Sequence, residues 1–251
     1  MALFMDGPIS SIEELQEHDT QLVQVASVEG IDVSKKLLLA QSEIAVELMA
    51  FVRKLSPGWA ATGGAFCMNR VVVTPPLKIW HTYLSLEMLY RDAYYSQMND
   101  RYAKRRDDYH EMAQWSRSKV IECGLGMTAD PLPRAAAPNL QAAPGSLPNA
   151  TYYAGMSWAN ASGEEGGCSL PATITTSGSS MLVQHGERPA NATGWHVYLG
   201  LDPQLLLRQN SAVLAVGEGW RQPDAVASGK PAGSGQAPGY VQAIVRVIER
   251  G

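Results

Sequence analysis

The chain has 251 residues, of which 45% are apolar and 18% charged, and its formal net charge at pH 7 is −4. This length allows two domains with cores of their own, and the lack of a basic excess argues against binding nucleic acid through overall charge. The first residues lack the basic and apolar regions of a signal peptide, and no apolar run approaches the roughly 20 residues of a membrane-spanning helix. We therefore expect neither a signal peptide nor a membrane span.

Two helices are expected in the first 55 residues. Ser10 and Glu13 have the spacing of a capping box, and the apolar residues that follow predict a short amphipathic helix that ends at Gly30. A longer helix is expected from about residue 32 to residue 55, before the Ser-Pro-Gly sequence that ends it. Its apolar residues recur at every third or fourth position along one face: Val33, Leu37, Ala40, Ile44, Leu48, Phe51 and Leu55.

The stretch from Thr74 to Gly124 is expected to form two long helices, or one helix with a break near Asn99–Asp100. Thr74 suits the N-cap, Pro75 suits the first turn, and Gly124 suits the helix end. Apolar residues lie on two faces of the first half, one with Leu77, Trp80, Leu84 and Met88, the other with Ile79, Tyr83, Leu86, Tyr90 and Tyr94. A helix that is apolar on two sides must be covered on both, by its own domain or by another subunit.

The pattern changes after this stretch. Residues 131–149 are rich in proline and alanine, which predicts a semi-rigid linker. From Thr151 onward apolar residues alternate with small or polar ones, first at Tyr152, Ala154, Met156 and Trp158. Further short strands are expected at 168–174, 181–184, 195–199, 205–208, 213–216 and 240–248. Short strands at close spacing, separated by glycine, proline and asparagine, predict an antiparallel sandwich.

These patterns predict a multidomain α + β protein, with an N-terminal α-helical bundle followed by an antiparallel β-sandwich. The helical domain is assigned to residues 1–130, the linker to residues 131–149 and the β-sandwich to residues 150–251. We expect the two domains to fold independently, because the periodicity changes across a proline-rich segment.

No combination of residues predicts a catalytic or metal site. The five histidines are not spaced as metal ligands, and the common nucleotide-binding and nucleophile motifs are absent from the sequence. Cys67, Cys123 and Cys168 are scattered and odd in number, which favours reduced packing residues over a disulfide framework or a zinc site. We therefore expect no enzyme activity, no cofactor and no metal.

The densest charge lies in the second half of the predicted helical region, at Arg101, Lys104, Arg105 and Arg106, followed by Asp107 and Asp108. One interpretation is a solvated helix face with internal salt bridges. The other is a basic patch that contacts DNA phosphates or an acidic partner. We take the four basic residues as the candidate contact site.

Several segments resemble known proteins. The run WHTYLSLEMLYRDAYYSQMNDRY (80–102), with GLG (124–126) and DPLP (130–133), is similar to helical head–tail connector, or adaptor, proteins of tailed-phage and prophage necks. This resemblance covers roughly residues 10–135 and is a helical pattern rather than a catalytic signature. The stretches TYYAGMSWANASGEEGGCS (151–169) and SSMLVQHGERPANATGWHVYLG (179–200) resemble strands of fibronectin type III or immunoglobulin-like modules appended to phage structural proteins.

The resemblance implies a structural virion protein, assembled in the host cytoplasm. Copies of the helical domain would form a closed ring around the DNA channel, joining the portal protein to a stopper or tail-completion protein. The β-sandwich would decorate the outside of the neck. In this setting Arg101, Lys104, Arg105 and Arg106 would meet passing genomic DNA without base readout, or an acidic surface of the portal. The implied partners include copies of the same chain but no membrane.

Two other classes of protein stay open. An adhesive, surface-binding protein would use the β-sandwich to recognise carbohydrate or a host protein through aromatic residues such as Trp220 or Tyr240. Packing within or beside strands is the alternative interpretation of both residues. The third class is an enzyme of unrecognised type. Association with a portal protein would separate a connector from an adhesin, because an adhesin has no reason to bind a portal.

Overall fold

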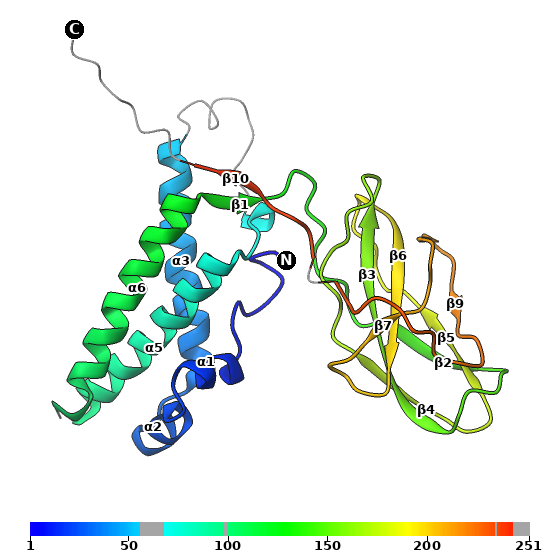
Figure 1. The fold of residues 1–251 in the computed structure, drawn as a ribbon, viewed down its shortest axis with the longest axis horizontal. Helices are drawn as coiled ribbons and strands as arrows, with labels where there is room; N and C mark the ends of the chain where they lie inside the picture. Colours follow the sequence, from blue (N-terminus) through cyan, green and yellow to red (C-terminus); the bar gives the residue numbers. More distant parts are fainter. Residues whose placement is uncertain (56–67, 98–99, 234, 243–251) are drawn as a thin grey trace, which may run out of the picture. The chain divides into compact units, whose positions relative to one another are not determined.

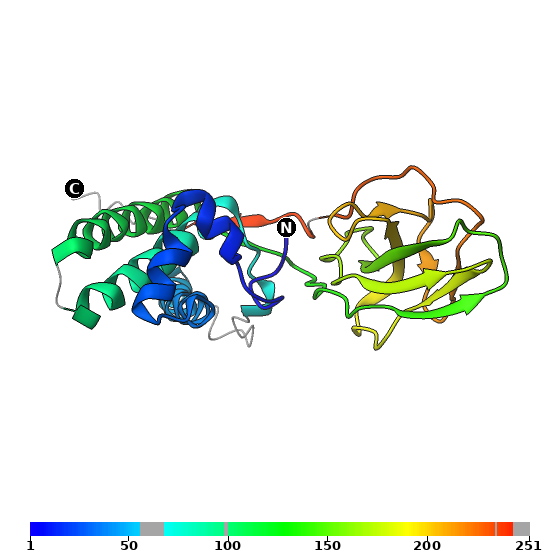
Figure 2. The ribbon, with the colours of Figure 1, turned by 90° about the horizontal axis from the view of Figure 1, so that it is seen from below.

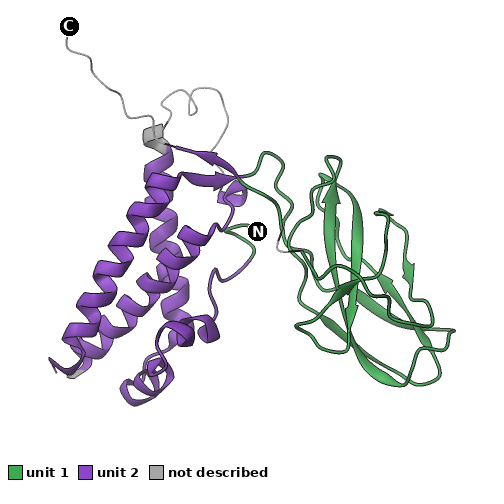
Figure 3. Cartoon of the chain, viewed as in Figure 1, with its two compact units in different colours: residues 1–6, 128–238 green, residues 7–127, 239–251 purple. Residues whose placement is uncertain are grey.

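A computed structural model of the chain describes residues 1–55, 68–97, 100–233 and 235–242. The chain forms two compact units, each assembled from separate segments (Figures 1 and 3). The helical unit comprises residues 7–127 and 239–251, and the β unit comprises residues 1–6 and 128–238. The protein therefore combines a helical N-terminal part with three antiparallel sheets. None of the helices in the described residues has the length and apolar character needed to cross a membrane.

The first predicted helix is divided in two, α1 (Ile12–His18) and α2 (Leu22–Glu29). The capping box is real but is shifted by one residue from the prediction. The hydroxyl of Ser11 accepts from the backbone N–H of Glu14 at 3.2 Å, and the carboxylate of Glu14 accepts from the backbone N–H of Ser11 at 3.1 Å. Gly30 ends α2 in the left-handed conformation, with φ of 66°.

The prediction of a long helix after Gly30 is confirmed by α3 (Val33–Leu55). The predicted apolar face is the buried one over most of its described length, with Val33, Leu37, Ala40, Ile44 and Leu48 all buried. Near the end of the helix the prediction is off by one residue, because Val52 is buried and Phe51 is only partly buried. A single, regular stripe was enough to place this helix correctly because its partner surface lies within the same unit.

The stretch after Thr74 forms two helices, α5 (Pro75–Gln97) and α6 (Ala103–Cys123), which follow the short 3₁₀ turns η1 (Met68–Arg70) and η2 (Asp100–Tyr102), respectively. Helix α5 packs against both α3 and α6 (Figures 1 and 2). The first predicted face is therefore largely covered within the unit. Leu84 is the exception on this face, because it is only partly buried. On the second face Leu86 and Tyr90 are buried, whereas Ile79, Tyr83 and Tyr94 are only partly buried.

The strand expected at 240–248 is not part of the β unit in its described portion. Strand β10 (Gly239–Val241) pairs antiparallel with β1 (Leu125–Met127), directly after α6. Buried Val71 forms an isolated bridge with Met127 on the same strand. The C-terminal segment thus returns to the helical unit, while positions 243–248 of the predicted strand lie outside the described residues.

The β unit contains two sheets. The three-stranded sheet has the order β2-β5-β9, with β2 (Asn139–Ala143), β5 (Ser180–Gln184) and β9 (Trp220–Arg221). The five-stranded sheet has the order β4-β3-β6-β7, with β8 also pairing with β6. Its strands are β3 (Ala150–Asn160), β4 (Ala172–Thr176), β6 (Ala192–Gly200), β7 (Leu207–Arg208) and β8 (Leu214–Ala215). All pairings in both sheets are antiparallel.

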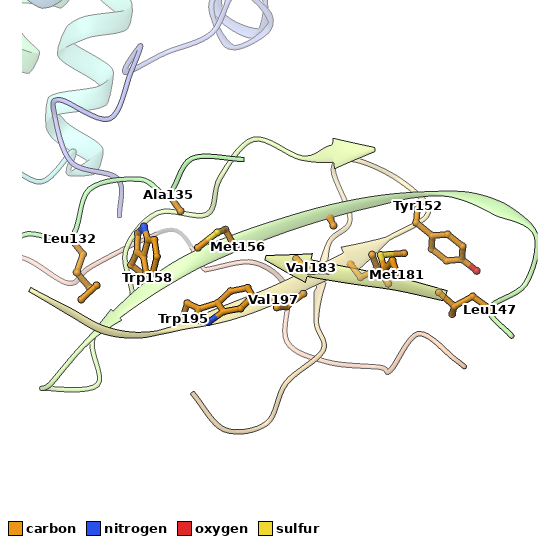
Figure 4. Close-up of a cluster of buried hydrophobic side chains, with 13 residues drawn as sticks. Leu132, Ala135, Leu147, Tyr152, Met156, Trp158, Met181, Val183, Trp195 and Val197 are labelled. Carbon is orange, nitrogen blue, oxygen red and sulfur yellow. The ribbon is translucent and has the colours of Figure 1, made fainter. Parts of the chain in front are cut away.

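One hydrophobic core is shared by the two sheets. Trp158 on β3 lies opposite Trp195 on β6 in the strand register, and both are almost fully buried (Figure 4). The core also takes Leu132, Ala135 and Leu147 from the segment predicted as a linker. That prediction is wrong for residues 131–149, because this segment supplies a strand and three core side chains to the β unit.

Candidate functional site

The four predicted contact residues lie at the start of α6 and in η2, but they do not form one free basic surface. Arg105 donates to the hydroxyl of Tyr90 at 2.7 Å and forms an ion pair with Asp19 at 3.3 Å. Arg106 forms an ion pair with Asp107 at 2.7 Å, and its guanidinium carbon lies 4.5 Å from the ring centre of Tyr94. Two of the four charges are therefore matched inside the unit.

The other two residues are more exposed. The guanidinium carbon of Arg101 lies 5.4 Å from the ring centre of Tyr102, while the side chain of Lys104 is exposed. The exposed basic surface that DNA or an acidic partner could reach is thus smaller than the sequence suggested, with Arg101 and Lys104 as its main members.

A buried carboxylate explains the position of Arg105. The side chain of Asp19 is only 5% exposed and accepts hydrogen bonds from the hydroxyls of Tyr90 at 2.5 Å and Tyr109 at 3.1 Å. Its other oxygen accepts from the backbone N–H of Gln21 at 2.9 Å. The carboxylate therefore ties the turn between α1 and α2 to both long helices of the hairpin, α5 and α6.

The electrostatics of this cluster keep its phenols neutral. Burial, followed by the hydrogen bond to Asp19, raises the pKa of Tyr90 above its ordinary value. Burial, followed by the charge of Asp19, likewise raises the pKa of Tyr109. Both hydroxyls remain hydrogen-bond donors at any physiological pH, so the arrangement serves as a structural anchor rather than as acid–base machinery.

The dense tyrosines mostly pack against one another. Tyr109 stacks with Tyr90 at 5.5 Å and with Tyr83 at 6.5 Å between ring centres, and His18 meets the ring of Tyr83 edge-on at 5.3 Å. Tyr90 also contacts Tyr102 at 6.0 Å. The aromatic density noted in the sequence is thus largely explained by packing around Asp19. Asp19 itself was missed because no local pattern singles it out.

A second buried polar group lies on α5. The Nε2 atom of His81 is 3.0 Å from the carbonyl oxygen of Leu37, and its Nδ1 atom is 3.0 Å from the hydroxyl of Ser10. Since a carbonyl can only accept, Nε2 carries the proton and Nδ1 accepts. Burial lowers the pKa of His81 to about 4, which keeps the ring neutral. This histidine links α5 to α3 and to the start of the chain.

Two hollows meet at His18 on the surface of the helical unit. One, of about 350 Å³, lies between the end of α1 and the first turns of α6, beside Asp108, Tyr109 and Met112. The other, of about 190 Å³, lies between α1 and the start of α5, beside Glu17 and Ile79. We call the two together the His18 groove. Arg105, one of the predicted contact residues, lines the larger hollow.

Apolar side chains also cover the outward side of α3. Leu38, Leu39, Val46 and Met49 are 57%, 51%, 62% and 41% exposed. Val46 and Leu39 lie about 200° around the helix axis from buried Ile44, so they point away from the core. We call these four residues the outer face of α3. On α6, Met112, Trp115 and Ile121 are similarly exposed, at 43%, 55% and 41%.

The β unit has a buried polar network around Glu165. The carboxylate of Glu165 accepts from the hydroxyls of Ser157, at 2.5 Å, and Tyr198. Burial raises the pKa of the neighbouring Cys168 thiol to about 12, which makes it a poor nucleophile. No group of three metal-binding side chains occurs among the residues that the structure describes.

The two aromatic residues considered for adhesion, Trp220 and Tyr240, do not lie together on one surface of the β unit. Trp220 packs against the core of the β unit, and exposed Tyr240 lies on β10 of the helical unit. No protein-family model matches the chain, and comparisons with curated proteins and with solved structures find no match either.

Proposed function

We propose that this protein is a structural component of a tailed-phage neck, in which copies of the helical unit form a ring around the DNA channel. The ring would join the portal protein to a stopper or tail-completion protein. The outer face of α3 is the observation that carries the proposal. It offers apolar side chains to a neighbour on a helix whose opposite side already forms the core.

The spacing of the outer face suits helix packing between subunits. Leu39 and Val46 are one heptad apart and Met49 follows three residues later, as in a seam between two helices. A large, contiguous apolar patch on a protein surface marks a contact with another protein or a ligand. A contact between different surfaces on successive copies closes into a ring when its rotation permits.

The β unit fits an outward decoration of fibronectin type III or immunoglobulin-like type. Two antiparallel sheets share one core in it, and its strands carry the segments that resemble such modules. Its exposed large apolar side chains lie in turns and loops rather than along a strand face. A unit built in this way can be displayed on a particle without a partner covering its sheets.

Self-association tests the proposal directly. Mass photometry of the purified chain, alone and with a portal protein from the same genome, should detect a ring-sized species. Replacing Leu39 and Val46 by Glu should abolish that species, because two charges cannot be buried unpaired at a helix seam. The control replaces Leu201 and Leu205 by Glu, since these exposed residues of the β unit lie outside the proposed seam. If the wild-type chain stays monomeric and does not bind the portal protein, the neck role is ruled out.

The contact role of the basic cluster is best tested at Arg101 and Lys104 alone, and not at all four basic residues. Replacing Arg105 would leave the buried carboxylate of Asp19 without its ion pair and so disturb the fold. We therefore expect Arg101→Gln with Lys104→Gln to change stability by less than about 1 kcal/mol. If these residues meet DNA or the portal, the double variant should still lower portal binding or infectious titre. Wild-type values of both would leave Arg101 and Lys104 as surface residues without a contact role.

A further inference from the structure

The His18 groove has an apolar floor. Ile79 from α5 lies in one hollow, and Tyr109 and Met112 from α6 lie in the other. Trp115, one turn after Met112 and 55% exposed, continues the apolar surface beyond the hollow. The floor therefore runs along the α5–α6 hairpin beside α1, rather than being a single isolated pit.

The charges around this floor are unbalanced. The two basic residues that line the hollows are already matched, Lys78 by Glu14 at 2.5 Å and Arg105 by Asp19 at 3.3 Å. Within the described residues, exposed Glu17 and Asp108 take part in no ion pair, and neither does Glu111 one residue before Met112. The charge that these three residues add at the rim is thus acidic, and exposed Lys104, one turn before Asp108 on α6, offsets only part of it.

The sequence next to the groove makes the electrostatic potential there more negative. The first 34 residues, which include α1 and α2, contain no lysine or arginine. Potentials of one sign along a groove select partners of the opposite sign and repel like-charged ones. DNA phosphates and anionic membrane surfaces are therefore disfavoured here, in contrast to the surface around Lys104.

The groove offers mainly side chains to a partner. It is lined by α1, α5 and α6, whose interior backbone groups are paired along each helix, and by Asp19 and Thr20 in the turn between α1 and α2. No strand lines either hollow, so there is no strand edge that could accept an extended peptide. A partner that matches an apolar floor and an acidic rim must present apolar residues on one side and basic residues beside them. An amphipathic helix does this with residues at positions i, i+3, i+4 and i+7.

We infer that the His18 groove is a docking site for a basic amphipathic helix of a partner protein. Apolar side chains of that helix would pack on Met112, Ile79 and Tyr109, and its lysine or arginine side chains would face Glu17 and Asp108. The groove is distinct from the outer face of α3. The inference therefore does not depend on ring formation, and it holds or fails separately from the neck role.

A labelled peptide tests the site. The probe is a fluorescein-labelled amphipathic helix of roughly 18 residues, or about five turns, with leucine on one face and lysine on the other. A peptide of the same composition in scrambled order serves as the comparison. Fluorescence anisotropy with the full chain should show the amphipathic peptide binding at least about tenfold more tightly than the scrambled one, with affinity falling as salt is raised.

Charge reversal locates the contact. Glu17→Lys with Asp108→Lys should weaken peptide binding by at least about tenfold, since both attractive charges become repulsive. The matched control, Glu187→Lys with Glu218→Lys, makes the same change in net charge on exposed residues of the β unit and should leave binding unchanged. Unaltered helical circular dichroism would show that the groove variant is folded, and an unaltered sheet band in the infrared spectrum would show the same for the β-unit control. Glu17→Gln with Asp108→Asn provides a milder second variant.

Several outcomes would overturn the inference. One is no binding of the amphipathic peptide at about 100 μM, and another is equal binding of the scrambled peptide. A third is an equal loss of affinity in the groove variant and the β-unit control, which would indicate a general charge effect. If the groove variant instead changes the oligomeric state measured by mass photometry, the occupant is a second copy of this chain rather than a partner protein.

Discussion

In the β unit the exposed large apolar side chains lie in turns and loops, at Met5, Leu170, Leu201, Leu205 and Val213. In the helical unit most of them lie along helices, including Val23 and Val28 on α2 and the outer face of α3. A pair of sheets buries one face of each strand against the other sheet and closes its core within the unit. A small layer of helices leaves the outer sides of its members uncovered.

The two units also use buried polar groups differently. In the helical unit, Asp19 and His81 join helices that are far apart in the sequence. In the β unit, Asn210 and Glu165 hold loops onto neighbouring strands. The comparison suggests that the β unit is complete by itself, whereas the helical unit keeps a fixed internal arrangement and offers its outer surfaces to partners.

The largest effect is expected from Trp195→Ala in the β unit. Trp195 is fully buried opposite Trp158, and truncating such a side chain costs about 3–5 kcal/mol of unfolding free energy. Urea unfolding should be followed by the sheet band of the infrared spectrum and by helical ellipticity. If the units are independent, the helical transition should not move. A parallel shift of both transitions would show that the two units unfold together.

A pair of leucines on one helix sharpens the contrast between core and outer face. Leu48 of α3 is 2% exposed, so Leu48→Ala should cost about 2–5 kcal/mol. Leu39→Ala, at a position that is 51% exposed, should cost less than about 0.5 kcal/mol in the dissociated chain. Leu84→Ala on α5 should fall between them, because this side chain is partly buried. Equal losses at Leu48 and Leu39 in thermal or urea unfolding would contradict the assignment of an outer face.

The smallest of the three effects is a pH dependence of stability, which we expect in the helical unit only. The pKa of His81 falls from 6.5 to about 4 on folding, because the ring is buried. Between these values the unfolded chain binds a proton that the folded chain does not. The stabilisation is therefore fully present above pH 6.5 and is lost as the pH falls toward 4, by up to about 3 kcal/mol.

A comparison of the wild type with His81→Gln separates the contribution of His81 to the pH dependence of stability from that of the carboxylates. Unfolding free energies of both proteins at several pH values from about 7.5 to 4 should converge as the pH falls. The β-unit transition should be the same in the two proteins throughout. A constant difference between wild type and variant across this range would mean that His81 does not titrate as its burial implies.

Periodicity predicted the elements that bury one regular face. Helix α3 and strand β3 were placed correctly because Ile44 and Leu48, or Met156 and Trp158, repeat at the spacing of their element. The role of Leu132 and Leu147 could not be predicted in the same way, because isolated apolar residues among prolines have no period. The capping box was shifted by one residue since Ser10 and Ser11 are adjacent and equally suited to the role.

The features that the sequence did not predict depend mostly on contacts between residues far apart in the chain. Arg105 looked like a free charge because its partner Asp19 lies 86 residues earlier in the chain. Strands β1 and β10 have three residues each, which is too short for an alternating pattern to be recognised. The outer face of α3 carried a signal that was available in the sequence: apolar residues at Leu38, Leu39, Val46 and Met49 fall outside the main stripe.

The pairing of β1 with β10 makes the β unit a removable insertion. Met127 and Gly239 are paired neighbours, so the chain leaves and re-enters the helical unit at adjacent points. A chain that joins these two residues by an Asn-Gly turn, and also omits residues 1–6, should keep its helical ellipticity because every helix is retained. A gene encoding such a protein could gain, lose or exchange the inserted segment by recombination while the helical scaffold stayed the same.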